Sequence, residues 1–482
     1  MGHRRSRRIR AATAAAGLAG LLITAGAIPA AVPAAAAPAL AAPGVFAWGG
    51  NWDGEVLGRP TDDSNGPTGP PTPTPFALPA SPVQVAAGSG DPEGRTSAAV
   101  LANGTLAMWG YDRDGELGDP RVTGPGLVIV PGLSNITQVS VGGNHVLALD
   151  SSGTVWSWGI NTHGELGDRA TGGSHPTPVP VPFLNQIVQV SAGDGYSLAL
   201  RSDGTVWAFG DNGRGQLGDG TIVSRNSPEQ IRGLGFITKV VAGTGTSYAI
   251  GAGGALLAWG SNAGGLLGNG STTGQSLTPV AVPGLSGVTA VATAANETLA
   301  VVGPAGTMWS WGPNSFGSTG NGTTTPSSSP APTGLSGVTQ VSAGPDNGAA
   351  VLANGTLMTW GFNYEGQLGN GSKDVFPPGV AHPTPGPVRT LAGVTQVAFS
   401  NGFALAIGSP APRVPSVIGQ TQAEAAQTLQ AAGFVLGRVA TVVDLTCEFL
   451  GEVKTQNPAA GTFDPPGTAV SVAIGKAGGK CL

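Results

Sequence analysis

The pattern Trp-Gly-x-Asn-x-x-Gly-x-Leu-Gly, or a close variant, recurs seven times along this chain. The copies begin at Trp48, Trp109, Trp158, Phe209, Trp259, Trp311 and Trp360. Successive copies start 49–61 residues apart. A repeat of about 40–50 residues that is built from short strands is typical of a β-propeller, in which each repeat forms one blade. The repeat therefore favours an all-β ring of seven blades.

Each repeat contains strand-length segments that are separated by turns. In Ile187–Gly218, an alternating apolar run is followed by Ser197–Leu200, a turn at Asp203-Gly204 and the segment Thr205–Phe209. These segments alternate with period two and are rich in β-branched and aromatic residues, as strands are. A two-residue hairpin turn needs positive φ, which Asp-Gly and Asn-Gly supply at low cost. Each repeat is thus predicted to form one antiparallel sheet.

The seventh blade is divided between the two ends of the repeat region. Val394–Gly408 contains the first strand segments of a repeat but lacks the terminal strand, whereas Val45–Gly49 is a terminal strand without its beginning. Pairing the two segments would close the ring and remove the open edges of the array. We therefore expect an all-β seven-bladed β-propeller that spans residues 44–408.

The recurring motif resembles the regulator-of-chromosome-condensation repeat, a family of seven-bladed propellers, over residues 44–408. The nuclear member of that family exchanges guanine nucleotide on a small GTPase, so the resemblance keeps an exchange-factor-like activity in view. A secreted bacterial propeller with a similar repeat inhibits β-lactamases. Enzyme inhibition is therefore the main alternative to simple binding.

The N-terminus has the three parts of a secretory signal peptide. Met1–Arg10 carries five arginines and no acid, Ala11–Ile28 is uncharged and rich in Ala and Leu, and Ala39-Leu40-Ala41 is a small-x-small cleavage sequence. We predict that residues 1–41 are removed, which makes the protein secreted or extracellular, with no transmembrane span in the mature chain. Export would also separate the propeller from any intracellular GTPase.

The charge balance argues against nucleic acid as a partner. Loss of the five arginines in residues 1–41 takes the formal net charge from −5 to −10. Neutralisation of phosphates by Lys and Arg supplies most non-specific nucleic-acid affinity, and the mature chain has no basic run. Chromatin binding is therefore not expected.

A different module follows the repeats, after a linker at residues 409–413. Thr421 and Glu424 form the sequence pattern of a capping box, and the predicted helix is Gln422–Ala432. Strand-like runs follow at residues 437–443, 451–456 and 469–474, and residues 477–482 are a tail. We expect a small α+β unit.

Residues 412–476 resemble a PASTA domain, the module attached to penicillin-binding proteins and bacterial serine/threonine kinases. The resemblance rests on Val414-Pro415-x-Val417-x-Gly419, Ala431-Ala432-Gly433-Phe434, Asn457–Gly461 and Pro466–Val470. It implies an extracytoplasmic bacterial protein. It also suggests contact with peptidoglycan or a muropeptide, although such domains also serve as spacers.

The sequence shows no pattern of a catalytic or metal site. His145, His163, His175 and His382 have no metal-ligand spacing, and His145 is interpreted as a hydrogen-bond donor in blade packing. The calcium-like run Asp112–Glu116 is interpreted as the turn that every blade shares. The paired aromatics Trp156/Trp158, Trp207/Phe209 and Trp309/Trp311 are interpreted as interblade packing. We expect no catalytic residue, no metal and no cofactor.

Binding is therefore expected to depend on the loops, which vary most between repeats. The most irregular loops are residues 59–81, 89–95, 168–182 and 371–388, and the last supplies the candidate binding residues Lys373, Asp374, Phe376 and His382. We interpret the chain as a secreted, non-enzymatic binding protein of the bacterial cell surface. The propeller would recognise an unidentified protein or glycan, and the PASTA domain would be the wall-proximal anchor. A third alternative, a glycan-cleaving enzyme, would require two carboxylates that converge on the substrate, and the sequence does not reveal such a pair.

The two cysteines of the chain, Cys447 and Cys481, are predicted to form a disulfide, because an even pair in a secreted protein is usually bridged. In the chain-entropy model such a bridge would contribute roughly 3–4 kcal/mol to a small module. Mass analysis after alkylation of the unreduced, exported protein should find no free thiol. Modification of both cysteines in the folded protein would rule the bridge out.

Overall fold

The structure is a computed structural model that describes residues 42–51, 54–56, 58, 69–88, 95–122, 124–374, 380–400 and 402–478. The predicted signal peptide at residues 1–41, the candidate residue Phe376 and Cys481 lie outside this range. The cleavage site and the disulfide therefore stay predictions. No helix in the described part of the chain has the length and apolar character needed to cross a membrane.

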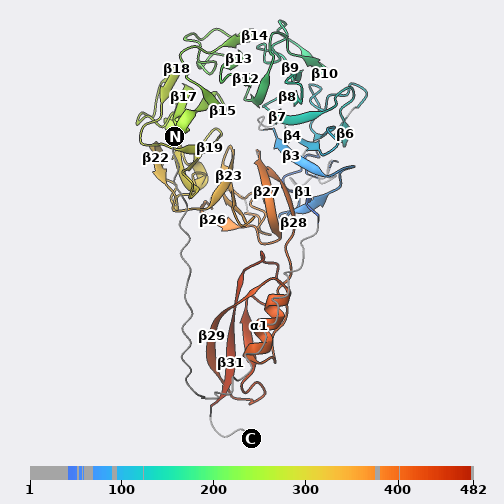
Figure 1. The fold of residues 1–482 in the computed structure, drawn as a ribbon, viewed down its shortest axis with the longest axis vertical. Helices are drawn as coiled ribbons and strands as arrows, with labels where there is room; N and C mark the ends of the chain where they lie inside the picture. The colour runs from blue at the N-terminus through green and yellow to red at the C-terminus, as the bar shows by residue number, and fades with distance from the viewer. Residues whose placement is uncertain are drawn as a thin grey trace, which may run out of the picture. The chain divides into compact units, whose positions relative to one another are not determined.

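Seven four-stranded antiparallel sheets form a ring, and each sheet is one blade (Figure 1). The first strand of each blade lies towards the centre of the ring. Blades 1 to 3 consist of β3 (Pro82–Ala87), β4 (Thr96–Leu101), β5 (Leu106–Gly110) and β6 (Val128–Ile129); β7 (Ile136–Val141), β8 (His145–Asp150), β9 (Val155–Ile160) and β10 (Ser174–Pro180); and β11 (Ile187–Ala192), β12 (Tyr196–Arg201), β13 (Val206–Gly210) and β14 (Arg225–Gln230).

The next three blades have the same strand order. Blades 4 to 6 consist of β15 (Ile237–Ala242), β16 (Thr246–Gly251), β17 (Leu256–Ser261) and β18 (Gln275–Ala281); β19 (Val288–Thr293), β20 (Thr298–Val302), β21 (Thr307–Gly312) and β22 (Ser327–Pro332); and β23 (Val338–Gly344), β24 (Asn347–Leu352), β25 (Leu357–Gly361) and β26 (His382–Pro387). The predicted fold class is confirmed.

Blade 7 joins the two ends of the repeat region, as predicted. It contains β27 (Leu391–Phe399), β28 (Phe403–Pro410), β1 (Gly44–Gly49) and β2 (Thr74–Phe76). Strands β1 and β28 pair antiparallel from Gly44 opposite Gly408 to Gly49 opposite Phe403. The backbone of the first strand is thus bonded within the last blade, and the ring has no open edge at this point.

A buried arginine strengthens the same closure. Arg95, at the start of blade 1, places Nη1 3.5 Å from Glu55 Oε1 of the loop after β1 and 3.2 Å from Glu365 Oε2 of the loop after β25. All three residues are buried. A lone buried charge would be costly, so Arg95 depends on the two carboxylates that surround it. The three side chains therefore link blades 1, 6 and 7, where the chain closes on itself.

Tryptophan side chains hold neighbouring blades together. Each indole Nε1–H donates a hydrogen bond of 2.6–2.8 Å to a backbone carbonyl of the preceding blade: Trp48 to Gln367, Trp109 to Glu55, Trp158 to Glu116, Trp259 to Gln216, Trp311 to Leu266 and Trp360 to Ser318. All six indoles are fully buried. Where Phe209 replaces tryptophan, Ser197 Oγ donates to the equivalent carbonyl of Glu165 at 2.9 Å.

The partner aromatics two residues earlier are less buried. Trp156, Trp207 and Trp309 are half-buried and pack against the edges of the blade cores. This position is consistent with the predicted packing role.

A second set of contacts links the innermost strands. One repeat-equivalent residue of the first strand, the third in blades 1 to 4 and 6 and the sixth in the longer β27 of blade 7, reaches from one blade to the backbone of the next: Gln84 to Val139, Gln138 to Val190, Gln189 to Val240, Lys239 to Thr289, Gln340 to Val397 and Gln396 to Val85. Ala290 occupies this position in blade 5 and cannot make the bond. The centre of the ring is therefore held by polar side chains as well as by apolar packing.

His145 has the packing role that the sequence predicted. Its Nε2 lies 2.9 Å from Ser197 Oγ of the next blade, and Ser197 in turn donates to Glu165 O, so the imidazole is the donor. Complete burial lowers the pKa of His145 to about 4. The imidazole of His145 is thus neutral at physiological pH.

The C-terminal module is a three-stranded sheet in the order β29-β31-β30 with one helix. The helix α1 (Gln422–Ala431) ends one residue earlier than predicted, and the strands are β29 (Val435–Asp444), β30 (Val453–Asn457) and β31 (Ala469–Ala477). Its capping box is present, since Glu424 Oε2 accepts the Thr421 N–H at 2.9 Å and Thr421 Oγ1 accepts the Glu424 N–H. The buried residues of this module form a core of their own: Val414, Val417, Ala425, Leu429, Phe434, Val453, Val470 and Val472.

Replacement of Trp158 by Phe should destabilise the propeller more than replacement of Trp259 by Phe. Both changes keep an aromatic ring and remove one donor. After the change at Trp259, Gln216 O still accepts the Ser247 hydroxyl at 2.8 Å. In blade 2 the residue equivalent to Ser247 is Val146, which cannot donate to Glu116 O. An unsatisfied buried carbonyl costs about 1–3 kcal/mol, so Trp158→Phe should lose that much and Trp259→Phe less than about 1 kcal/mol. Denaturant unfolding measures both, and equal losses would contradict this account.

The side chain of Glu116 should make stability depend on pH. Burial raises its pKa from an ordinary value near 4.5 to about 8, so the folded protein holds a proton that the unfolded chain releases. The stabilisation is therefore complete below pH 4.5 and is lost as the pH rises towards 8. Glu116→Gln, which places the residue of blade 3 in blade 1, should raise stability at pH 8 by up to about 4 kcal/mol, and much less at pH 5. Unfolding midpoints at the two pH values test this, and an equal gain at both would refute it.

Candidate functional site

The loops that follow the third strand of each blade all lie at the same end of the strands, on what we call the Asn-turn face. In six blades an asparagine Oδ1 accepts the backbone N–H five residues later at 2.9–3.2 Å: Asn51, Asn161, Asn212, Asn262, Asn314 and Asn363. Asp112 accepts from Leu117 at 2.9 Å in the same way. The run Asp112–Glu116 is thus the turn shared by the blades, as predicted.

In the first copy of the repeat, Val56 is the donor residue. Its N–H donates to Asn51 Oδ1 at 2.9 Å, and its side chain is buried like the leucines at this position in blades 1, 2 and 3.

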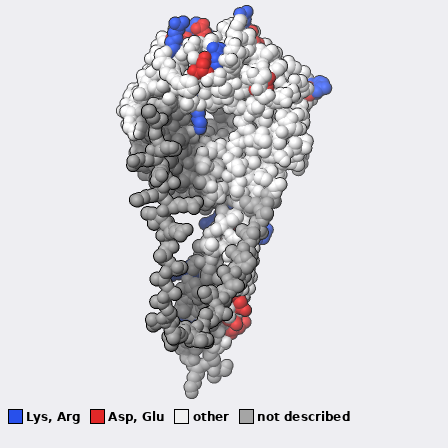
Figure 2. Space-filling view, in the orientation of Figure 1, with Lys and Arg blue, Asp and Glu red and all other residues white. Residues whose placement is uncertain are grey.

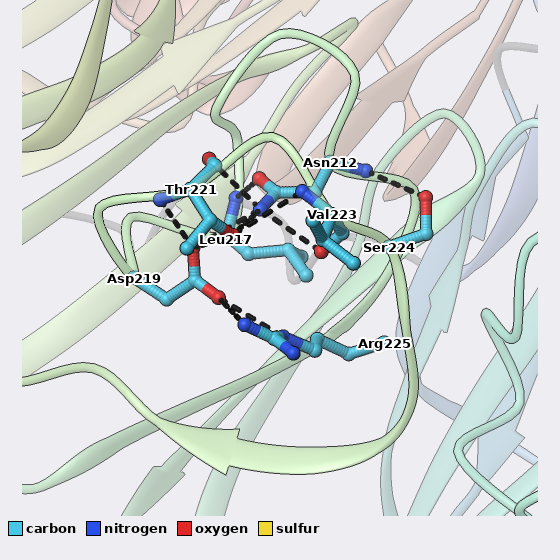
Figure 3. A network of polar contacts seen from close by, with 7 residues as sticks. All are labelled: Asn212, Leu217, Asp219, Thr221, Val223, Ser224 and Arg225. Atoms are coloured by element: carbon cyan, nitrogen blue, oxygen red, sulfur yellow. Dashed lines mark hydrogen bonds and ion pairs between the residues drawn. The ribbon is translucent and has the colours of Figure 1, made fainter.

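In blades 2 to 6 the same asparagines also fix the longer part of the loop, because Nδ2 donates to a backbone carbonyl nine residues later. In blade 3, Asn212 Nδ2 donates to Thr221 O at 3.0 Å and to Val223 O at 3.2 Å, and Asp219 Oδ2 accepts from Arg225 Nη2 at 2.7 Å (Figure 3). The loop of blade 3 is therefore held at both ends by side chains of its own repeat. A loop held in this way presents its remaining residues in a fixed arrangement.

Two of the predicted binding residues lie together in the equivalent loop of blade 6. His382 Nε2 is 3.2 Å from both carboxylate oxygens of Asp374. Corresponding pairs join Asp168 to His175 at 2.9 Å and Asp219 to Arg225. The Asp374–His382 pair therefore closes its loop as other blades do. Lys373 is adjacent in sequence, and burial lowers its pKa. A binding role for these residues stays a prediction.

The described part of the Asn-turn face is hollowed between blades 2 and 3. One cavity of about 300 Å³ is lined by Asn144, Ile160, Thr162, His163, Glu165, Asp194, Gly195 and Asp211. A second, of about 470 Å³, shares Thr162 and His163 and is otherwise lined by Thr171, Ser224, Arg225, Asn226, Ser227 and Glu229. We call the two cavities together the His163 groove.

The inner part of the His163 groove is acidic. Glu165 Oε2 accepts the His163 N–H at 2.6 Å, and burial raises the pKa of Glu165. Across the cavity from Glu165, blade 3 contributes Asp194 and Asp211, and Asp211 Oδ2 accepts from Gln216 Nε2 at 2.7 Å. Arg225 lies in the outer cavity. Among the described residues no three His, Cys, Asp or Glu side chains are placed to hold a metal ion.

The His163 groove was not predicted from the sequence. Its residues come from four loops of two blades, and none of those loops is distinctive alone. The available signal was the position two residues after each turn asparagine, where His163, Arg214, Phe316 and Glu365 differ although their surroundings repeat.

Comparisons with known proteins agree with the architecture. Mitochondrial RUG3 of Arabidopsis thaliana is 35% identical over 151 residues, which cover 29% of this chain and 34% of RUG3. Human HERC2 is 27% identical over 269 residues, which cover 53% of this chain and 6% of HERC2. The chain thus spans about a third or less of these relatives.

Two solved structures share the propeller fold. Prp20p of Saccharomyces cerevisiae has a TM-score of 0.66 at 20% identity, over 77% of this chain and 93% of that chain. Human WBSCR16 has a TM-score of 0.65 at 23% identity, over 77% of this chain and all of that chain. The profile of the RCC1-like domain matches residues 30–330 and 125–411, and that of the PASTA domain matches residues 412–476. The chain belongs to the RCC1-like domain family and carries a C-terminal PASTA domain.

Proposed function

We propose that this protein is a secreted, non-enzymatic binding protein of the bacterial cell surface. The propeller is the recognition scaffold, and the PASTA domain is the anchor near peptidoglycan. The observation that carries the proposal is the division of the Asn-turn face into constant and variable parts. The turn asparagines repeat from blade to blade, whereas the residues they display differ.

The propeller is suited to binding because its loops are held in place before any partner arrives. A loop that is already ordered loses little conformational entropy on binding. The Asn212 network and the acid–base pairs of blades 2, 3 and 6 hold these loops in place. The His163 groove between blades 2 and 3 is still partly empty. The groove leaves room for a ligand or for side chains of a protein.

The PASTA domain supports a location at the cell wall, since such domains typically bind peptidoglycan or muropeptides. Strand β29 is an edge strand of the sheet, and Val435, Val443 and Leu445 on or beside it are exposed to 50%, 45% and 85%. Exposed apolar side chains in a row are typical of an interaction surface. The signal peptide predicted for residues 1–41 would bring this surface to the wall.

A second candidate function is inhibition of a secreted enzyme such as a β-lactamase. The His163 groove favours it, because Glu165, Asp194 and Asp211 line one cavity and Arg225 lines the next. Opposed charges of this kind suit a charged protein surface better than a neutral ligand.

Sedimentation with purified peptidoglycan tests the anchor. The mature chain should co-sediment, and the chain without Pro412–Leu482 should stay in solution, because the acidic propeller has no electrostatic reason to bind an anionic wall. The PASTA core contains no propeller residue, so the truncation leaves the propeller cores intact. The ring's unfolding midpoint serves as the folding control.

Two results would contradict the proposal. If both forms stay in solution, the anchor role is lost and enzyme inhibition becomes the better explanation. If the propeller alone sediments, the roles of the two domains are reversed.

A further inference from the structure

The propeller has a charged part and an almost uncharged part. Residues 240–372, which form most of blades 4 to 6, contain no Lys or Arg and three acids, Glu297, Asp346 and Glu365. Figure 2 shows charged side chains gathered at the top of the view, around β13 and β14 of blade 3. This sparsely charged part of the ring, which we call the neutral part, therefore has no cationic side chain to bind an acidic ligand.

Three aromatic side chains lie together in this neutral part, on the Asn-turn face between blades 5 and 6. The ring centroids of Phe316 and Phe362 are 4.8 Å apart, and those of Phe362 and Tyr364 are 6.2 Å apart with planes inclined by 29°. All three side chains are half-buried. We call these three residues the aromatic platform.

The aromatic platform occupies the repeat-equivalent position of the His163 groove. Phe316 follows Asn314 by two residues as His163 follows Asn161, and Phe362 precedes Asn363 as Asp211 precedes Asn212. The same interblade position thus carries a histidine and an acid in one half of the ring and aromatic rings in the other. A change of this kind alters what the position can bind and leaves the blade unchanged.

Polar groups border the platform. The Phe362 N–H donates to Asp346 O at 3.0 Å, which places Asp346 beside the central ring. Asn296 Nδ2 donates to Asp346 Oδ1 at 2.8 Å, and Asn296 O accepts the Asn314 N–H at 2.9 Å. A carboxylate and an amide beside aromatic faces can bind hydroxyl groups while the faces pack against C–H groups.

The backbone at Phe316 indicates that the ring is retained at a cost. Phe316 has φ 52° and ψ 16° within the turn Ser315–Gly317. The equivalent residue of blade 4 is Gly264, with φ 63° and ψ 14°. A bulky residue is disfavoured in this left-handed region, where glycine is not, and such strain is concentrated at functional sites. Packing alone does not need Phe316, because blade 4 is complete with glycine there.

We propose that the aromatic platform binds a neutral pyranose glycan, whose sugar rings stack on Phe316, Phe362 and Tyr364 and whose hydroxyls bond Asp346 and Asn296. The face of an aromatic ring has partial negative character, so it attracts the polarised C–H groups of a sugar ring. The inference names a ligand class for the recognition scaffold proposed above and rests on that proposal. It does not depend on the PASTA domain.

The test uses calorimetric titration of the mature full chain with maltohexaose and, separately, cellohexaose, two neutral pyranose chains whose sugar is absent from peptidoglycan strands. The variant replaces the platform by the residues of blade 4: Phe316→Gly, Phe362→Ser and Tyr364→Ala. Affinity for the neutral hexamer should fall at least tenfold. Binding of one hexamer alone would assign the linkage that the platform accepts, and binding of both would assign pyranose chains in general.

Two controls separate binding from folding. Phe316→Gly alone should weaken binding while leaving the unfolding midpoint unchanged or higher, since glycine removes the backbone strain. Phe236→Ser removes a lone phenylalanine, 57% exposed, that packs on the Asp203-Gly204 turn at the opposite end of the strands, and should leave affinity unchanged. Polygalacturonate should bind at least tenfold more weakly than the neutral hexamer, because Asp346 beside the platform is acidic and residues 240–372 contain no Lys or Arg.

The inference is overturned if neither neutral hexamer binds, or if the platform variant binds as tightly as the natural chain. It is also overturned if polygalacturonate binds best. The two tests can fail separately. If the platform variant loses hexamer binding but the mature chain does not sediment with peptidoglycan, the glycan site stands and the wall anchor is refuted.

Discussion

The bond from a buried tryptophan indole to a carbonyl of the preceding blade is the contact on which the ring depends. It couples the apolar core of one blade to the backbone of another, and it occurs at six of the seven blade junctions. A buried carbonyl must find a donor, so two neighbouring blades can pack in one relative position only. Where Phe209 breaks the series, Ser197 still donates to the carbonyl of Glu165, as Ser97 and Ser247 donate to the equivalent carbonyls beside their indoles. The carbonyl of Glu165 therefore keeps one donor without an indole.

The indole bonds also fix the turns of the Asn-turn face. The carbonyls that receive the indoles belong to the same turns that the asparagines organise, so each turn is fixed both by its own repeat and by the next blade. The residues between these fixed points can vary without loss of the fold. His163, Phe316 and Glu365 occupy one such point and give three chemically different junctions. A charged groove and an aromatic platform can therefore exist on one ring.

Much of this architecture was predictable, and the reasons are local. The split seventh blade, the Asp112 turn and the role of His145 follow from the position of each residue within its repeat. The capping box of α1 depends on two residues three apart. The candidate site was predicted less well. The loop with Asp374 and His382 was chosen because it is irregular, yet this pair closes a loop as its counterparts do in blades 2 and 3.

The sequence by itself determined the number of blades, the closure of the ring and the chemistry of its turns, because strand periodicity, turn preference and capping act over a few residues and the repeat states them seven times. The tertiary structure decided which variable residues meet. Asp194 joins His163, and Phe316 joins Phe362, across a junction between blades, and they are 31 and 46 residues apart in the chain. Their approach depends on how one blade packs against the next, and no pattern within a single repeat contains that information.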